Sequence, residues 1–287
     1  MQYEGQICRG PMERGSFMLP VAVGCRYNAC TFCMLFKHLK YRELPLEQVE
    51  AEILRVKNMG GAPETVFLGD GNAFSLPFER LEKILEMINL HLPSCKSVNM
   101  DATVTDISEK SDGQLKALYS LGARHLYLGI ESGLDDVLAF TNKDHTLAQA
   151  YEQIGRLQRA GLIFDAHMMT GIAGKGRGIE NAEATASFFN RTRPSRIINF
   201  SLFVHRRSPL YKSVENGSFA PASERENLQE AKSLIELLDL KSAVFDGFHD
   251  MVTFRVRGEL PQKKEKMISL IEKKISETPE DIYCIVK

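Results

Sequence analysis

The 287-residue chain has almost no net charge, no long apolar run and few cysteines, and each scarcity excludes a class of protein. Its 36 Lys and Arg residues nearly balance its 37 Asp and Glu residues, which argues against electrostatic binding of nucleic acid or anionic lipid. No apolar run approaches the roughly 20 residues that a membrane helix needs. The first residues lack the basic and apolar regions of an export signal. We therefore expect a cytoplasmic protein with no nucleic-acid or membrane partner.

The six cysteines are distributed unevenly, with Cys25, Cys30 and Cys33 in one short segment and the other three scattered. Three cysteines in one loop cannot all pair in disulfides, so they indicate a metal or redox cofactor in a reducing compartment. A closed zinc site needs four ligands, for which only Cys8 and His38 lie nearby in sequence. An iron–sulfur cube held by three cysteines keeps one iron open for a ligand, and we favour this reading. A non-catalytic iron–sulfur or zinc protein is the alternative.

Hydrophobic periodicity predicts strands that alternate with helices. Apolar runs of strand length occupy residues 19–24, 65–69, 98–103, 125–130, 164–170 and 197–204. Helical spacing occupies residues 46–59, 78–91, 108–121, 146–160 and 179–191. Strands that are apolar on both faces and alternate with helices indicate a parallel sheet of βαβ units. Such units fit a doubly wound sheet or a barrel, and in both folds ligands gather at the C-terminal ends of the strands.

Unusual residues follow the predicted strands at the ends where ligands are expected. They are Gly24-Cys25, Gly69-Asp70-Gly71-Asn72, Asp101, Glu131-Ser132, Gly171 and His205-Arg206. The pattern changes after Pro209, with a helix predicted near residues 224–240, a strand at 252–256 and a charged helix at 261–276. We therefore expect an N-terminal extension over residues 1–17, a core over 18–210 and a C-terminal annex over 211–287.

The cysteine loop, which has an aromatic residue before its last cysteine, resembles that of the radical S-adenosylmethionine (SAM) superfamily. Its C-x4-C-x2-C spacing is one residue longer than the common C-x3-C-x2-C pattern. Further matches follow in order at residues 68–72, 128–133, 170–174 and 208–211. Residues 128–133 are similar to the branch that contains oxygen-independent coproporphyrinogen oxidases and methylthiotransferases. The flanks, residues 9–11, His249 and residues 258–264, resemble small members of the superfamily without an assigned function.

This resemblance implies an α/β fold, namely a partial (β/α)6 TIM-like barrel with a small C-terminal α/β annex. It implies that Cys25, Cys30 and Cys33 hold a [4Fe–4S] cluster, whose fourth iron binds the amine and carboxylate of SAM. One electron, from a donor such as flavodoxin or ferredoxin, cleaves SAM to a 5′-deoxyadenosyl radical. That radical abstracts hydrogen from a small-molecule substrate, while the protein positions the reactants and excludes water.

The resemblance also implies which residues contact SAM. Asp70, Gly71 and Asn72 approach the methionyl amine, because glycine lets the backbone come close to a ligand. The remaining contacts are Phe32 beside the adenine, Glu131 on the ribose hydroxyls or the amine, Lys143 on the carboxylate, and Gly171 with Ile172 after the fifth strand. The alternatives are packing for Phe32, a tight turn for residues 70–72, an ion pair of Glu131 with Lys143 or Arg124, and a solvated surface position for Lys143.

The candidate catalytic residues are Arg206, Asp101 and His249. Arg206 and its neighbour Arg207 suit an anionic substrate, because guanidinium groups bind carboxylate and phosphate well. Asp101 is expected at the same mouth, and His249 could transfer protons above it. A solvent-facing basic edge and a structural histidine are the alternatives. A porphyrin-type substrate is a second possibility, suggested by the coproporphyrinogen oxidase-like residues.

Overall fold

The structure is a computed structural model that describes residues 8–286 and divides into two compact units. The first unit comprises the chain up to Asn28, Cys33–Leu128 and Glu152–Phe164; the second comprises Ala29–Phe32, Gly129–Tyr151 and the chain from Asp165 onward. Residues 1–7, which belong to the predicted N-terminal extension and include the segment inspected for an export signal, lie outside the described residues.

A parallel sheet forms the centre of the first unit, with its strands in the order β1-β4-β5-β6. The strands are β1 (Phe17–Pro20), β4 (Thr65–Gly69), β5 (Ser97–Ala102) and β6 (Ala123–Glu131), and β2 (Ala22–Val23) pairs antiparallel with β3 (Arg42–Glu43). Val66, Phe67 and Leu68 in β4 are fully buried, as expected for a parallel strand that is covered on both faces. Parallel strands alternating with helices confirm the predicted α/β class.

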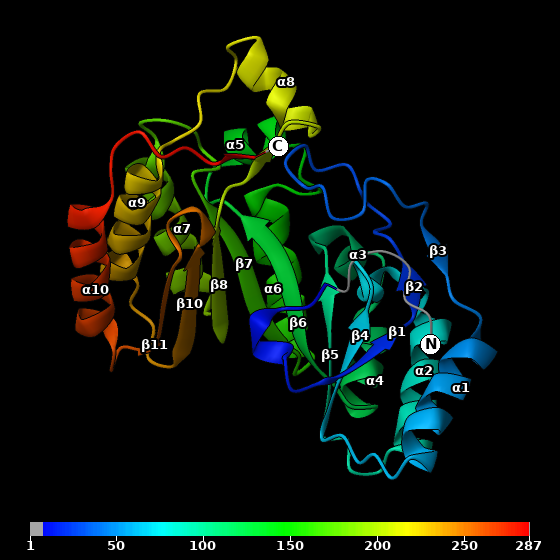
Figure 1. Cartoon of the computed structure of the whole chain (residues 1–287). Helices are drawn as coiled ribbons and strands as arrows, with labels where there is room; N and C mark the ends of the chain where they lie inside the picture. The colour runs from blue at the N-terminus through cyan, green and yellow to red at the C-terminus, as the bar shows by residue number, and fades with distance from the viewer. Residues whose placement is uncertain (1–7, 287) are drawn as a thin grey trace. The chain divides into compact units, whose positions relative to one another are not determined.

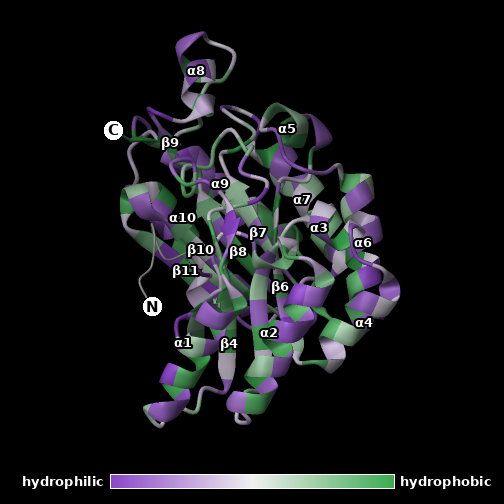
Figure 2. Cartoon of the chain, turned by 90° about the vertical axis from the view of Figure 1, so that its right-hand side faces the viewer, coloured by the Kyte–Doolittle hydropathy of each residue, from purple (hydrophilic) through white to green (hydrophobic). Residues whose placement is uncertain are grey.

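The helices of the first unit each bury one apolar face. They are α1 (Leu46–Asn58), α2 (Phe78–His91), α3 (Val104–Ser108) and α4 (Asp112–Ser120), together with the short 3-10 turns η1 (Pro11–Glu13) and η2 (Ala73–Ser75). Leu81, Ile84 and Ile88 of α2 are buried at helical spacing, and Figure 2 shows purple and green residues mixed along the helices. The helix predicted over residues 108–121 is present as α4 but begins later, at Asp112, and α3 before it was not predicted. Thr103 and Ser111 each begin a separate helix with a capping box.

The second unit also contains a mainly parallel sheet, in the order β7-β8-β10-β11. Its strands are β7 (Ile163–Thr170), β8 (Arg196–Ser201), β10 (Ala243–His249) and β11 (Phe254–Leu260), and β9 (Val204–His205) pairs with β12 (Ile285–Val286). β10 runs parallel to β8, and β11 returns antiparallel beside it. The strand predicted at residues 252–256 is therefore corrected to two strands, of which β10 had not been predicted.

Helix α9 packs against both α7 and α10 in the second unit (Figure 1). The helices are α5 (Asp135–Phe140), α7 (Gly178–Thr192), α8 (Pro209–Glu215), α9 (Glu224–Leu237) and α10 (Lys264–Glu277), the 3-10 turn is η3 (Asp250–Val252), and α6 (Leu147–Arg159) runs from this unit into the first. Asn227, Leu228, Ala231 and Leu234 of α9 are fully buried. This helix therefore presents polar as well as apolar side chains to the interior.

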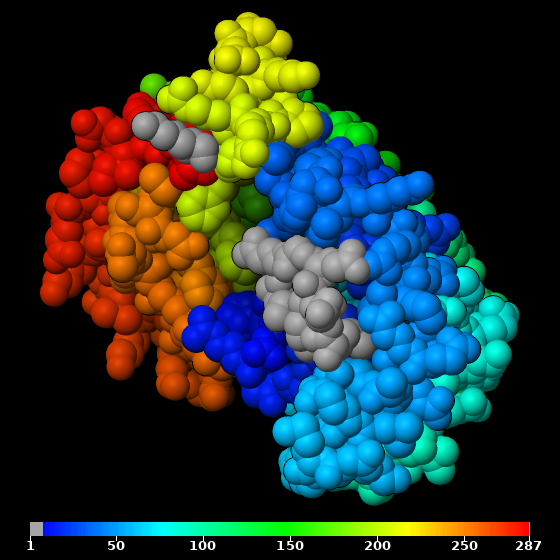
Figure 3. Space-filling model, turned by 45° about the vertical axis from the view of Figure 1, so that its right-hand side comes forward, coloured from blue at the N-terminus to red at the C-terminus, as the bar shows by residue number. Residues whose placement is uncertain are grey.

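No helix within residues 8–286 is both long and apolar enough to cross a bilayer. Residues 25–43 are mostly partly or fully exposed. Figure 3 shows the blue and light-blue atoms of the first unit, which include part of this segment, at the molecular surface. The predicted cysteine loop thus begins at an accessible position.

Candidate functional site

The cysteine loop begins directly after β2, and its first half lies in the first unit. The Cys25 sulfur accepts a hydrogen bond from the backbone N–H of Asn28, with 3.5 Å between the atoms. Asn28 has a left-handed backbone (φ 43°), and its side chain donates to the Phe36 carbonyl over 3.0 Å. Its own carbonyl accepts from the Lys37 ammonium. Burial raises the pKa of the Cys25 thiol, so the free group is a thiol rather than a thiolate.

The other half of the loop, Ala29–Phe32, belongs to the second unit. Thr31 donates its N–H to the Thr141 carbonyl and accepts from the N–H of Leu210, both over 3.0 Å. Phe32 packs against two apolar clusters, one containing Leu210 and the other containing Ile172. The structure therefore brings Phe32 and Ile172 together in one apolar cluster.

All six cysteines lie within the described residues and none forms a disulfide. Cys25 and Cys33 belong to the first unit and Cys30 to the second. Among residues 8–286, no three His, Cys, Asp or Glu side chains form a group that could hold a single metal ion. A [4Fe–4S] cluster does not require its cysteines to converge on one ion, because each cysteine binds a different iron.

The turn after β4 buries two side-chain oxygens, Asp70 Oδ1 and Asn72 Oδ1, that have no hydrogen-bond partner among residues 8–286. Only 5% of Asp70 and 2% of Asn72 is exposed, and burial raises the pKa of Asp70 to about 6. Gly71 between them has a left-handed backbone (φ 54°), and a Cβ there would lie 2.4 Å from the carbonyl oxygen of Gly24. Buried oxygens without a partner are costly, so this turn fits a hydrogen-donating ligand beside the start of the cysteine loop.

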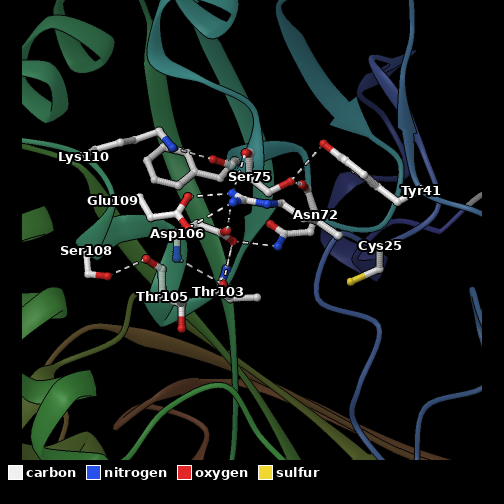
Figure 4. A network of polar contacts seen from close by, with 12 residues as sticks. Cys25, Tyr41, Asn72, Ser75, Thr103, Thr105, Asp106, Ser108, Glu109 and Lys110 are labelled. Carbon is white, nitrogen blue, oxygen red and sulfur yellow. Dashed lines mark hydrogen bonds and ion pairs between the residues drawn. The ribbon is translucent and has the colours of Figure 1, made fainter.

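Asp106 holds the Asn72 amide in place (Figure 4). Its Oδ2 accepts from Asn72 Nδ2 over 2.6 Å, from the Thr103 hydroxyl over 2.6 Å and from the Thr103 N–H over 3.0 Å. Arg26, next to Cys25, lies 4.0 Å from the other Asp106 oxygen and forms a two-point ion pair with Glu109 at 2.6 and 3.2 Å. The sequence prediction missed Asp106. The Thr103-x-x-Asp106 capping box was its only local signal.

Asp101 occupies an electrostatically unfavourable position in the first unit. Burial raises its pKa to about 7, and the charges of Glu13 and Asp70 add to this effect. Cys8 lies in the same environment. Burial raises the pKa of its thiol to about 12, and the charges of Asp101, Cys33 and Asp70 add to this shift. Asp101 and Cys8 are therefore both close enough to Asp70 for its charge to affect their pKa values.

Glu131 and Lys143 form a buried ion pair in the second unit, with 3.3 Å between Oε1 and Nζ. Asp144 lies 3.9 Å from the same ammonium. Burial by itself would lower the pKa of Lys143, but Glu131, Cys30 and Asp144 outweigh it and raise the pKa. Lys143 is therefore not the solvated surface lysine considered above. Glu131 has a left-handed backbone (φ 63°), a conformation that in residues other than glycine often marks functional sites.

The turn after β7 begins at Gly171, whose backbone is left-handed (φ 82°). Its N–H donates to Glu230 Oε2 over 2.8 Å, and a Cβ at this position would lie 2.5 Å from the side-chain oxygen of Asn227. Both partners come from α9, which the sequence analysis had not connected with this turn. Gly171 is therefore required by close packing.

Stability should depend on pH through Glu230, whose burial raises its pKa to about 8 and whose neighbour Glu226 adds to the shift. The folded protein then keeps a proton that the unfolded chain, with a carboxyl pKa near 4.5, releases. Stabilisation from this group is complete below the unfolded pKa and is lost as the pH rises through about 8. We expect Glu230 to lower the free energy of unfolding of the metal-free protein from pH 6.5 to 8 by at most about 1.4 kcal/mol per pH unit. Asp101, whose pKa is raised to about 7, adds a decrease of the same sign.

Urea unfolding at several pH values checks this expectation, with Glu230→Gln as the matched variant. This pH range avoids the opposite effect of His167, whose pKa burial lowers to about 4. The variant should show a flatter dependence than the wild type. Equal slopes in both proteins would contradict the assignment.

The structure places the other two candidate catalytic residues in different environments within the second unit. Arg206 is exposed, with its guanidinium carbon 5.8 Å from the centre of the Tyr211 ring. His249 ends β10 and is fully buried, with Nδ1 3.5 Å from Glu224 Oε2. The other Glu224 oxygen accepts from the Ser201 hydroxyl over 2.6 Å. Glu224 was not among the predicted site residues, because in sequence it reads as a charged residue at the start of an exposed helix.

Comparison with known proteins identifies the family. A sequence model of the radical SAM superfamily matches residues 19–189, more than half of the chain. The heme chaperone HemW of Bacillus subtilis is 25% identical over 207 residues, covering 70% of this chain and 53% of that protein. The tRNA-2-methylthio-N(6)-dimethylallyladenosine synthase of Chlorobium luteolum is 23% identical over 239 residues, covering 80% and 50%. The chain thus spans about half the length of these curated relatives.

A solved structure gives the same result for the fold. The coproporphyrinogen III oxidase HemN from Escherichia coli, described as a radical SAM enzyme, matches with a TM-score of 0.59 at 13% identity. The match covers 77% of this chain and 51% of that one. This likeness confirms the predicted partial-barrel α/β fold, and the superfamily match confirms the predicted cofactors. The chain belongs to the radical SAM superfamily and is an enzyme whose cofactors are a [4Fe–4S] cluster and SAM.

Proposed function

We propose that this enzyme uses SAM to abstract hydrogen from a small anionic molecule. One observation carries the assignment of the SAM site, namely the two buried oxygens of Asp70 and Asn72 that have no hydrogen-bond partner in the described part of the chain. They flank Gly71, which packs against Gly24, the residue before Cys25. The methionyl ammonium of SAM would be a suitable ligand here, because it donates several hydrogen bonds and would lie beside the cluster-binding loop. When bound, the cluster and SAM together supply one-electron cleavage of the sulfonium and a 5′-deoxyadenosyl radical.

In this proposal the residues of the first unit hold the cluster and the amine. Cys25 and Cys33, with Cys30, supply three thiolates, and the open fourth iron is left to SAM. Asp70 and Asn72 accept hydrogen bonds from the ammonium, and Gly71 leaves room for it. Asp106 keeps the Asn72 amide nitrogen occupied, so the amide oxygen is the atom offered to the ligand.

The residues of the second unit are assigned to the rest of SAM. Phe32 and Ile172 supply apolar surface for the adenine, and Gly171 allows the backbone to approach it. Glu131 accepts from the ribose hydroxyls, while Lys143 stays charged beside it and attracts the methionyl carboxylate. The buried ion pair supports these roles, because each charge is already compensated before the ligand arrives.

The substrate assignments are Arg206, Asp101 and His249. Arg206 is exposed and stacked on Tyr211, which suits reversible binding of a carboxylate or phosphate. Glu224 lies beside His249, with 3.5 Å between Oε2 and Nδ1, and would hold the orientation of the imidazole ring. Asp101, whose pKa is raised to about 7, can hold or release a proton near neutral pH. We assign electron supply to a flavodoxin or a ferredoxin.

Anaerobic reconstitution with iron and sulfide tests the proposal. After reduction and addition of SAM, we expect about four irons per chain and release of 5′-deoxyadenosine. A colourless protein that retains zinc and leaves SAM intact would contradict it and favour a zinc protein. Once cleavage is established, small carboxylates and phosphates are screened for faster 5′-deoxyadenosine release. Stimulation by a porphyrin and by no small anion would overturn the substrate class.

A further inference from the structure

A carboxylate on α9 connects the turns that follow β6 and β7. Glu230 is 1% exposed, and its Oε2 accepts the Gly171 N–H over 2.8 Å. Its Oε1 accepts from Asn181 Nδ2 over 2.6 Å. The oxygen of the same Asn181 amide accepts from the Ser132 hydroxyl over 2.5 Å. Three consecutive hydrogen bonds thus link Gly171 to Ser132 through two buried side chains.

The turn at Ser132 is fixed to α7 by further contacts. Gly133 donates its N–H to the Thr185 hydroxyl over 2.9 Å, and a Cβ on Gly133 would lie 2.3 Å from the Thr185 nitrogen. Glu131, which immediately precedes Ser132, carries the carboxylate assigned to the SAM ribose. Any displacement of Ser132 therefore moves Glu131, and any displacement of Gly171 moves its neighbour Ile172.

The use of a carboxylate here is costly. Among the described residues, Gly171 and Asn181 donate to it and the charge of Glu226 acts on it, and none of these three is a cation. A buried carboxyl group without a cation must keep its proton to avoid the cost of burying a charge, whereas an amide could form two hydrogen bonds with no group to titrate. Groups in such unfavourable environments gather at functional sites more often than in ordinary cores. Packing alone therefore does not account for Glu230.

We propose that Glu230 is a positioning residue for SAM, holding the Ser132 and Gly171 turns in their binding arrangement. The inference rests on the proposed function, because it requires that these turns contact SAM. Both turns lie within residues 19–189, the segment shared with the superfamily, whereas Glu230 lies beyond it. The C-terminal segment thus braces the binding turns.

Two variants and a control test the proposal by equilibrium dialysis of SAM against the reconstituted protein. Glu230→Leu removes both acceptors at similar volume and is expected to raise the Kd for SAM at least about tenfold. In Glu230→Gln the new amide can accept from the Gly171 N–H. It can also donate to Asn181 once the Asn181 amide has rotated by about 180°, so the Kd for SAM should stay within about threefold of the wild-type value. Glu236→Gln on the exposed side of the same helix should leave the Kd unchanged. Iron content and thermal unfolding confirm that each variant is folded and loaded.

A second measurement needs no SAM. Hydrogen exchange of the metal-free protein should quicken in peptides that contain residues 131–134 and 170–174 for Glu230→Leu, and not for Glu236→Gln. If Glu230→Leu does not fold, Asn181→Ala replaces it, and its Kd should rise at least about threefold. A folded Glu230→Leu or Asn181→Ala protein with wild-type affinity would overturn the inference. Wild-type protein that binds no SAM would instead overturn the proposed function.

Discussion

Alanine at Cys25, Cys30 and Cys33 together is expected to abolish iron retention and to lower 5′-deoxyadenosine release at least about 100-fold. The loop supplies every thiolate that the proposal assigns to the cluster, and without the cluster no electron reaches SAM. Iron analysis after anaerobic reconstitution and quantification of 5′-deoxyadenosine measure the two effects. Folding should persist, because all three side chains are only partly buried and form no disulfide.

Two single variants serve as controls for this experiment. Cys95 is partly buried and far from the loop in sequence, so Cys95→Ala should keep both iron and activity. Cys8 is the more informative control, because Asp70 and Cys33 lie close enough to affect the pKa of its thiol. Cys8→Ala should also retain the cluster. Loss of iron from that variant would mean that four cysteines close the site and leave no iron open to SAM.

Gly71→Ala is expected to lose the iron–sulfur cluster, whereas Gly60→Ala is expected to retain it. Both glycines have left-handed backbones (φ 54° and 77°), so alanine costs about 1–2 kcal/mol of stability at either position. At Gly60 a Cβ meets nothing within 4 Å, whereas at Gly71 it would lie 2.4 Å from the Gly24 carbonyl oxygen. Relief of that overlap must displace Gly24 and with it Cys25. Iron content after reconstitution should therefore fall severalfold in Gly71→Ala alone.

Thermal unfolding of the metal-free proteins separates the two causes. Equal decreases in Tm with equal iron content would show that only backbone conformation matters at Gly71. A larger decrease for Gly71→Ala, with loss of iron, is the expected outcome. The comparison also tests the proposed SAM site, since Gly71 stands between Asp70 and Asn72.

The sequence allowed prediction of those features that depend on local pattern. β4 is a run of buried apolar residues, and the turn that follows it is recognisable in sequence from its polar and glycine residues. β10 was not predicted, because Asp246 and Gly247 interrupt its apolar pattern. Asp246 is nevertheless fully buried, and its carboxylate forms two contacts of 2.7 and 2.6 Å with Arg255 of β11. A charge neutralised by the neighbouring strand leaves no trace in local periodicity.

Asp106 and Glu230 escaped prediction for a related reason. Each acts on a residue far away in sequence, Asp106 on Asn72 and Glu230 on Gly171. In sequence both read as ordinary charged residues on helices. The pair of Glu131 and Lys143 was considered because the two residues are close in the chain, and the structure contains it.

The parallel pairing of β10 with β8 has a consequence for any shortened form of the protein. β8 has β7 on one side and β10 on the other, so both rows of its backbone groups are satisfied. Deletion of everything after residue 210 would turn β8 into an exposed edge strand with unpaired N–H and C=O groups. Exposed edge strands pair with strands of other molecules and so promote aggregation. Residues 211–287, about a quarter of the chain, therefore also protect the protein from aggregation, and binding studies need all 287 residues.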